Sequence, residues 1–280
     1  MMQDLRVERK GRLLAVKDLP TLPTVLDEVS KLVQDPASST EQIAKVISKD
    51  QVLSAKVLKM VNSPIYGFPR RISTIQHALV LLGFNVIKGL IISTSVFDIM
   101  AKNMIGLWEH SLGCALACSS IAKIAGLKDP EEYSVAGLLH DLGKVVATVQ
   151  LPELKEEIDV LLKEKELTYI EAEVEVMGFG HDRVNAWLSD HWHLPLRLRE
   201  ALAWHHRPKS AQHYPDMAAV VHIGDFLTRA FEVGSGGDDH ISYLKPEALE
   251  ILNLKLTDLE KVLDDLGQEF VELSDFRPED

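Results

Sequence analysis

Side chains able to bind a divalent cation recur between residues 110 and 225 of this 280-residue chain. The adjacent pair His140-Asp141 lies in the segment AGLLHDLGK, and further histidines precede and follow it. Imidazole nitrogen and carboxylate oxygen together form the mixed ligand set that many transition metals accept. The candidate metal ligands, in chain order, are His110, His140, Asp141, His181, His205, His206 and Asp225.

The His140-Asp141 pair is the expected centre of this site. Neighbouring residues of a helix point about 100° apart, so both side chains can face one point only at a helix end or at a local distortion. Gly137 and Gly143 flank the pair and predict close packing around it. An aspartate can bridge two cations through its two oxygens, whereas a histidine supplies one nitrogen to one of them. A site for one or two metals is therefore expected, completed by remote segments.

Each candidate also has a simpler explanation when it is taken alone. His110 could lie on a helix surface, and His205-His206 could end a helix, where a cationic imidazole interacts well with the dipole. His181 could be the neighbour of a helix cap. Asp225 is more informative, because it interrupts the apolar segment VHIGDFL, where an unpaired carboxylate is costly. The other histidines are assigned to structure or solvent: His77, His191, His193, His213, His222 and His240.

Helical periodicity dominates the elements that must position these residues, and strand signals are scarce. The Gly- and Asp-rich segment EVGSGGDDH at 232–240 is the clearest predicted loop. Gly83 predicts a helix end, as does Pro64 after Asn62. The predicted helices cover roughly 22–34, 38–50, 52–62, 72–83, 85–102, 105–125, 131–149, 153–164, 168–177, 180–192, 196–206, 213–232 and 255–274.

Composition describes an ordinary globular protein with an acidic balance. Apolar residues make up 46% of the chain and charged residues 26%, enough for a sizeable core. The 30 Lys and Arg against 42 Asp and Glu leave a net charge of −12, which argues against binding a nucleic-acid backbone. The adjacent pair Arg70-Arg71 is interpreted as a solvated turn.

Nothing in the N-terminal segment MMQDLRVERKGR is typical of a secretion signal. The apolar stretches 78–100 and 112–127 are interrupted by polar residues and glycines, so neither predicts a membrane span. Cys114 and Cys118 fall on one helix face and are interpreted as small buried hydrophobes in a reducing compartment. We therefore expect a cytoplasmic protein without a membrane or nucleic-acid partner.

The order His, His-Asp, His, His-His, Asp resembles the HD superfamily of metal-dependent phosphohydrolases. The segment SKDQVLSAKVLKMVNSPIYG, followed by ISTIQHALVLLG, is similar to the HDOD domain, a bacterial signalling relative of that superfamily. The resemblance covers roughly residues 15–232. It implies an all-α fold with an N-terminal helical subdomain (1–103) packed on an HD-type metal-binding core (104–232). A loop and a C-terminal helix (233–280) follow.

The resemblance also implies roles for the candidate ligands. Asp141 would bridge two divalent metals, and His110 and Asp225 would complete the first metal together with His140. His181, His205 and His206 would bind the second. Fe or Mn is favoured for such nitrogen and oxygen ligands, with Zn or Ni as alternatives.

Two functions follow from the resemblance, and they belong to different classes. An HDOD signalling module would act through contacts with a regulatory protein partner and would use its metals structurally or as a sensor. A phosphohydrolase would bind a nucleotide or another phosphoester, with Asp141 and Lys144 as catalytic residues and Arg207 as a further cation for the developing charge. The Gly-Tyr-Pro signature of the related cyclic-dinucleotide phosphodiesterases does not follow His206 here.

Overall fold

Helices account for every regular element in residues 8–9, 11–13, 24–34 and 38–274, which are the residues that the computed structural model describes. This confirms the predicted all-α class. The elements are α2 (Thr24–Gln34), α3 (Thr40–Ile47), α4 (Gln51–Val61), α5 (Ile75–Asn103), α6 (Leu107–Ile124), α7 (Pro130–Leu139), α8 (Leu142–Gln150), α9 (Pro152–Glu164), α10 (Tyr169–Met177), α11 (His181–His191), α12 (Leu196–Trp204), the 3-10 turn η1 (Pro208–Ser210), α13 (Pro215–Ala230), α14 (Pro246–Leu252) and α15 (Leu256–Ser274).

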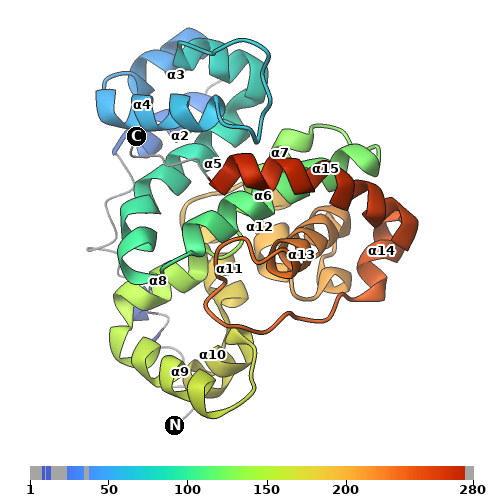
Figure 1. Cartoon of the computed structure of the whole chain (residues 1–280). Coiled ribbons are helices and arrows are strands. Elements are labelled where there is room, and N and C mark those ends of the chain that lie inside the picture. Colours follow the sequence, from blue (N-terminus) through green and yellow to red (C-terminus); the bar gives the residue numbers. More distant parts are fainter. Residues whose placement is uncertain (1–7, 10, 14–23, 35–37, 275–280) are drawn as a thin grey trace.

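The helices form a continuous stack with α6 near its centre (Figure 1). Helices α2, α3 and α4 gather at one end of the molecule, and α9 and α10 lie at the opposite end. Helix α6 packs against α7, α13 and α15, while α5 contacts both the N-terminal helices and α7. The long helix α5 thus connects the N-terminal helices to the part of the fold that carries the candidate ligands.

Local sequence signals begin and interrupt the N-terminal helices. Ser39 and Gln42 form a capping box at the start of α3, and the Asp50 carboxylate accepts from the backbone N–H of Leu53 at the start of α4. The predicted break at Gly83 is confirmed, because this residue has a φ of 76° and kinks α5.

Helix α6 is buried along most of its length, which explains its lack of a polar face. Cys114 and Cys118 are fully buried within it, with their Sγ atoms 3.9 Å apart, and the prediction that they act as buried hydrophobes is confirmed. Residues 75–96 of α5 are long and apolar enough to cross a membrane by composition alone. Since 67% of that stretch is buried inside the fold, a core helix explains it.

Two predicted features of the chain need correction. The single helix predicted for 131–149 is wrong, because α7 ends at Leu139 and α8 begins at Leu142. The short helix α14 was not predicted, since its few residues carry little periodicity. The chain segment between α13 and α14 has no regular structure, which confirms the loop predicted at 232–240.

Candidate metal centre

The break between α7 and α8 falls at the His140-Asp141 pair and lets both side chains face one region. His140 follows the last residue of α7, and Asp141 precedes α8 with φ −98° and ψ 8°, outside the helical range. Tight packing fixes the two helices on either side of the pair. A Cβ added at Gly137 would lie 2.7 Å from the Cys114 carbonyl oxygen, and one at Gly143 would lie 2.4 Å from that of His181.

A first group of ligand atoms forms where α6, the α7–α8 junction and α13 meet. The Nε2 atoms of His110 and His140 lie 3.3 Å apart, and Oδ1 of Asp225 is 3.0 Å from the first and 3.6 Å from the second. All three side chains are almost fully buried. Three segments that are remote in sequence therefore bring two nitrogens and one oxygen together within the span of one ion's ligand shell.

A second group forms where α11 begins and α12 ends. Nε2 of His181 lies 3.3 Å from Nε2 of His205 and 2.9 Å from Nε2 of His206. His181 is the first residue of α11, and His205 and His206 follow the last turn of α12. Three imidazole nitrogens thus converge on one point, and only His206 is partly exposed.

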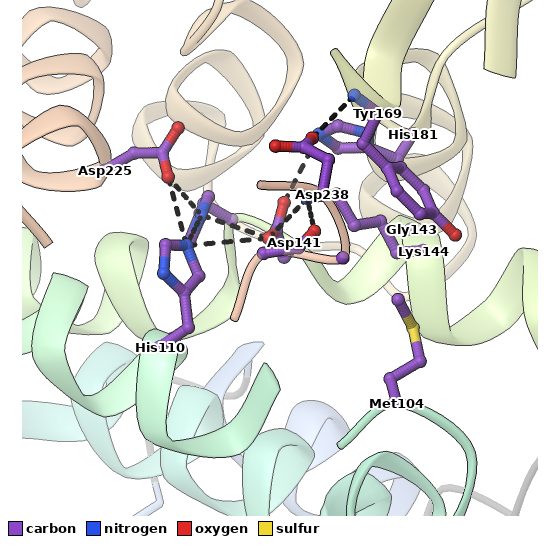
Figure 2. Close-up of polar contacts among 12 residues, drawn as sticks. Met104, His110, Asp141, Gly143, Lys144, Tyr169, His181, Asp225 and Asp238 are labelled. Atoms are coloured by element: carbon purple, nitrogen blue, oxygen red, sulfur yellow. Dashed lines mark hydrogen bonds and ion pairs between the residues drawn. The ribbon is translucent and has the colours of Figure 1, made fainter. Parts of the chain in front are cut away.

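The carboxylate of Asp141 lies between the first group and His181 of the second group (Figure 2). Its Oδ2 is 3.4 Å from Nε2 of His140 and 3.7 Å from Nε2 of His110. Its Oδ1 is 3.3 Å from Nε2 of His181. One side chain therefore faces both groups with different oxygens, and the structure brings together all seven residues that the sequence singles out.

The opposite ring nitrogens are held by groups that accept hydrogen bonds. Nδ1 of His140 donates to the Gly137 carbonyl at 2.6 Å, and Nδ1 of His205 donates to the Leu202 carbonyl at 3.0 Å. These contacts place a ring proton on Nδ1, so that the neutral ring carries its lone pair on Nε2, the tautomer that a metal requires.

Glu173 fixes the ring of His181 in the same way, through a hydrogen bond with Nδ1. The sequence did not identify Glu173 as a functional residue. Its Oε2 accepts from the backbone N–H of His181 at 2.7 Å and from Nδ1 of the ring at 2.6 Å. Glu173 is fully buried in α10, and burial raises its pKa well above the ordinary value. The signal for it was an acidic residue in the apolar face of the predicted helix 168–177, as for Asp225.

The charge states of the cluster suit a cation. Burial lowers the pKa of His110 and His181 below the ordinary value and brings that of His205 to about 4, so these imidazoles are neutral. Burial acts in the same direction on His140, but Asp141, Cys114 and Asp225 together outweigh it and raise the His140 pKa. Neutral imidazoles beside buried carboxylates form a donor set that fits a divalent metal.

Lys144 lies beneath Asp141 and is itself completely buried. Its Nζ donates to Oδ2 of Asp141 at 2.7 Å and to the Gly236 carbonyl at 2.8 Å, and it lies 4.9 Å from the centre of the Tyr169 ring. The ammonium group is therefore fully engaged with protein groups. In this arrangement it neutralises Asp141 and anchors the segment that contains Gly236.

Residues 233–238, which we call the strap, cover the first group, a role that sequence analysis did not predict for this loop. A Cβ at Gly234 would lie 2.2 Å from the Gly106 carbonyl oxygen and 2.4 Å from the His110 backbone nitrogen. A Cβ at Gly237 would lie 2.8 Å from the Tyr169 ring. Glycines let the strap lie directly on the helices that carry the ligands.

Arg229 ties the strap to the first group. Its Nε donates to Oδ1 of Asp225 at 2.9 Å, and its Nη1 donates to Oδ1 of Asp238 at 2.8 Å. The other Asp238 oxygen accepts from the backbone N–H of Tyr169 at 2.6 Å. A candidate ligand, an arginine and the strap are thus joined in one buried network.

The second group opens toward a cavity of about 1070 Å³. His206 lines this cavity together with Arg207, whose guanidinium donates to the Asp182 carboxylate at 2.7 Å. Phe179 also lines it and packs edge-on against Trp187. The first group is therefore sealed, whereas the second has a path to the solvent beside His206.

The histidines assigned to structure or solvent have mixed surroundings. His222 is buried, accepts from the Lys245 backbone N–H at Nε2 and contacts the His205 carbonyl through Nδ1, so it supports a candidate ligand indirectly. His213 binds Glu200 at the surface. His240 lines the cavity beside the second group.

Comparison with known proteins identifies a family for this chain. The family model for the HDOD domain matches residues 19–208. A curated protein of Treponema pallidum (strain Nichols), named only as uncharacterized, is 25% identical over 220 residues, which cover 76% of this chain and 43% of that protein. The uncharacterized protein YuxH of Bacillus subtilis (strain 168) is 32% identical over 117 residues, 41% of this chain and 28% of that protein. The chain thus spans less than half of either curated relative.

Solved structures share the fold over nearly the whole chain. An HDOD domain protein of unknown function from Geobacter sulfurreducens superposes with a TM-score of 0.74 at 25% identity, covering 98% of this chain and 97% of that one. A protein from Marinobacter aquaeolei VT8, provisionally named as a signal transduction protein, gives 0.75 at 17% identity and covers 98% and 64%. A provisionally named phosphohydrolase from Shewanella amazonensis SB2B gives 0.68 at 24% identity, covering 94% and 97%.

Proposed function

The chain belongs to the HDOD domain family, and we propose that it is a bacterial signalling module that binds divalent metal and acts through contacts with a regulatory protein. The observation that carries the metal assignment is the Asp141 carboxylate lying between two groups of buried imidazole nitrogens. Buried carboxylates and histidine lone pairs that face one another are costly unless a cation joins them.

Two ions fit the donor set best. When bound, they would tie α6, α11, α12 and α13 together and would polarise any water or phosphate oxygen that reached them. Nitrogen and oxygen donors in this mixture favour Fe or Mn, with Zn or Ni as alternatives. The residues that would hold the ions are His110, His140, Asp141 and Asp225 for the first, and Asp141, His181, His205 and His206 for the second.

The burial of the centre supports the module over an enzyme. His110 and His140 are at most 1% exposed, and the strap lies over them. Lys144, the residue that an enzyme would direct at a phosphate, is occupied by Asp141 and by the Gly236 carbonyl. The signal-transduction name of the Marinobacter aquaeolei protein is in keeping with this role.

One observation favours a second candidate function, a metal-dependent phosphohydrolase. The cavity beside His206 is large enough for a nucleotide, and Arg207 lies on its wall. In that case Asp141 would help to hold the metals, which would supply Lewis-acid chemistry, and Arg207 would neutralise charge on the phosphoester. The phosphohydrolase name of the Shewanella amazonensis protein agrees with this alternative.

Metal analysis combined with a hydrolysis screen separates the two functions. Purified wild type, His140→Ala and Asp141→Ala proteins are assayed for bound metal by mass spectrometry. They are then incubated with bis-p-nitrophenyl phosphate, nucleotides and cyclic dinucleotides. The module predicts two ions in wild type and fewer in each variant, no turnover by any protein, and equal capture of a partner by all three. Turnover by wild type that both variants abolish makes the enzyme the function, and wild type without metal overturns the metal centre.

A further inference from the structure

Asn185 is almost fully buried in α11 and belongs to neither group of candidate ligands. Helix α11 packs against α8, which follows Asp141, and against α12, which precedes His205. We infer that Asn185 is a positioning residue that caps α8 in place of Asp141 and leaves the Asp141 carboxylate available to the ions; this role rests on the proposed metal centre.

Asp141 precedes the first residue of α8, the position from which an aspartate usually caps a helix. There the carboxylate accepts from the backbone N–H of the second or third helical residue, which has no partner inside the helix. Within the part of the chain that the structure describes, the Asp141 side chain makes no such bond. Its oxygens lie instead 3.3 Å from Nε2 of His181 and 2.7 Å from the Lys144 ammonium (Figure 2).

The Asn185 side chain supplies the missing acceptor from a different helix. Its Oδ1 accepts from the backbone N–H of Gly143, the second residue of α8, at 2.7 Å. A Cβ added at Gly143 would lie 3.0 Å from this oxygen, so glycine lets α8 approach α11 closely enough for the bond. The donor at the start of α8 is thus satisfied without the Asp141 carboxylate.

The amide nitrogen of Asn185 holds the other side of the break between α7 and α8. It donates to the carbonyl of His140, which follows the last residue of α7. It also donates at 3.3 Å to the Leu202 carbonyl, the group that accepts from Nδ1 of His205. Since two carbonyls and one N–H surround the amide, a single orientation of it satisfies all three. One side chain therefore supports ligands of both groups.

A role in packing alone would have a different consequence from a role in positioning. Asn185 follows His181 by four residues, so both side chains lie on one face of α11. Without the Asn185 amide, the unpaired N–H at the start of α8 would compete with the ions for the Asp141 carboxylate. Loss of a positioning residue should therefore lower metal affinity, whereas loss of a packing residue should lower stability alone.

Titration of the metal-free protein with Mn²⁺, followed by the electron paramagnetic resonance signal of the free ion, tests this role. Asn185→Ala removes all three hydrogen bonds, and we expect the Mn²⁺ affinity to fall about 10–100-fold. Asn185→Asp keeps an oxygen acceptor for the Gly143 N–H, so its affinity should stay within about tenfold of the wild-type value. The Gly143 amide of metal-free protein should exchange its hydrogen faster in Asn185→Ala than in wild type or Asn185→Asp.

Asn62→Ala is the matched control. Asn62 follows α4 and makes the same kind of backbone bonds, donating to the Ile72 carbonyl at 2.9 Å and accepting from the Ile72 N–H at 2.7 Å. Its loss should lower the melting temperature and leave the Mn²⁺ affinity unchanged.

Several outcomes overturn the role of Asn185. These are wild-type Mn²⁺ affinity in Asn185→Ala, an equal loss of affinity in Asn62→Ala, and unchanged exchange at the Gly143 amide. If Asn185→Ala does not fold, a loss well beyond tenfold in Asn185→Asp overturns the role as well. Wild type that binds no Mn²⁺ would instead remove the metal centre itself, so the two failures are distinguishable.

Discussion

Glu173 holds His181 at two points, through the backbone N–H at 2.7 Å and through the imidazole Nδ1 at 2.6 Å. The two residues belong to successive helices, α10 and α11, and both are almost fully buried. The double contact sets both the position of the first residue of α11 and the direction of its ring. Nε2 of His181 is thereby aimed at Asp141 and at the two histidines after α12.

Glu173→Gln should therefore weaken metal binding at the second group more than at the first. An amide accepts more weakly than a carboxylate and can present N–H groups to the ring, which disturbs the tautomer. Loss of such a supporting partner typically costs about 10–100-fold in metal affinity. Competition with a fluorescent chelator measures the two affinities, and one of them should drop much more than the other.

Glu175→Gln is the matched control for this change. Glu175 lies two residues further along α10, is half exposed and pairs with Lys165 in a surface contact. Its substitution should leave both affinities unchanged. Equal metal affinities in wild type and Glu173→Gln protein would show that Glu173 does not orient a ligand.

Asp141→Asn should release metal and lower the melting temperature, because binding energy adds to folding energy. With free metal at about 100 times Kd, binding of the metal adds about 2.7 kcal/mol to the free energy of unfolding. At about 2–4 °C per kcal/mol for a domain of this size, the melting temperature should drop by about 5–10 °C. Differential scanning calorimetry with and without excess metal measures the drop.

A chelator separates lost metal from lost packing in the Asp141→Asn protein. Since Lys144 would lose its anionic partner, part of the drop should persist in metal-free protein. Added metal should raise the melting temperature of wild type alone. An equal rise for the variant would contradict the bridging position of Asp141 between two ions.

Sequence patterns identified the candidate metal ligands but not Glu173, the residue that orients one of them. Asp225 and His140 are polar residues within apolar stretches, and their burial needs a partner that the sequence itself suggests. Glu173 gives the same signal, but the seven histidines and aspartates already completed two ligand sets. The break after Leu139 was missed because apolar residues lie on both sides of His140 and Asp141, so that α7 and α8 together have the pattern of one helix.

The strap could not be derived from its sequence either. A run of glycines and aspartates predicts a loop, but not the surface on which the loop lies. Two contacts hold the strap in position. The Lys144 ammonium donates to the Gly236 carbonyl, and the Arg229 guanidinium donates to Asp238. These contacts join residues that are 92 and 9 positions apart. Only the folded arrangement reveals that the loop seals the first group.

Gly234→Ala should displace the strap and destabilise the protein. Gly234 has a φ of 65°, and its added methyl group would lie 2.2 Å from a backbone oxygen and 2.4 Å from a backbone nitrogen. Neither neighbour can move like the end of a side chain, so we expect a loss of about 1–3 kcal/mol. Hydrogen exchange at the His110 amide should also become faster, since the strap covers it.

Gly267→Ala provides the opposite expectation in the same chain. Gly267 lies inside α15, and nothing lies within 4 Å of an added Cβ. Alanine is the better helix former, so the free energy of unfolding should rise by up to about 1 kcal/mol. Urea unfolding measures both variants, and a Gly234→Ala protein as stable as wild type would show that the strap tolerates a side chain.

The Glu200 carboxylate should make the protein less stable in acid. It is buried in α12 and accepts from three backbone N–H groups and from His213. Burial acts to raise its pKa, but these hydrogen bonds outweigh it and hold the pKa below the ordinary value. Its contribution is therefore present above the unfolded pKa of about 4.3 and is lost as the pH falls through the lower folded pKa.

Glu200→Gln should lower the free energy of unfolding by about 1–3 kcal/mol at neutral pH, because an amide accepts these hydrogen bonds more weakly. The difference from wild type should shrink as the pH falls below about 4, where the wild-type side chain also loses its charge. Urea unfolding at several pH values measures this convergence. Glu250→Gln, which removes an exposed carboxylate paired loosely with Lys209, should change stability little at any pH. A difference between wild type and Glu200→Gln that stays constant with pH would mean that packing, and not charge, explains the role of Glu200.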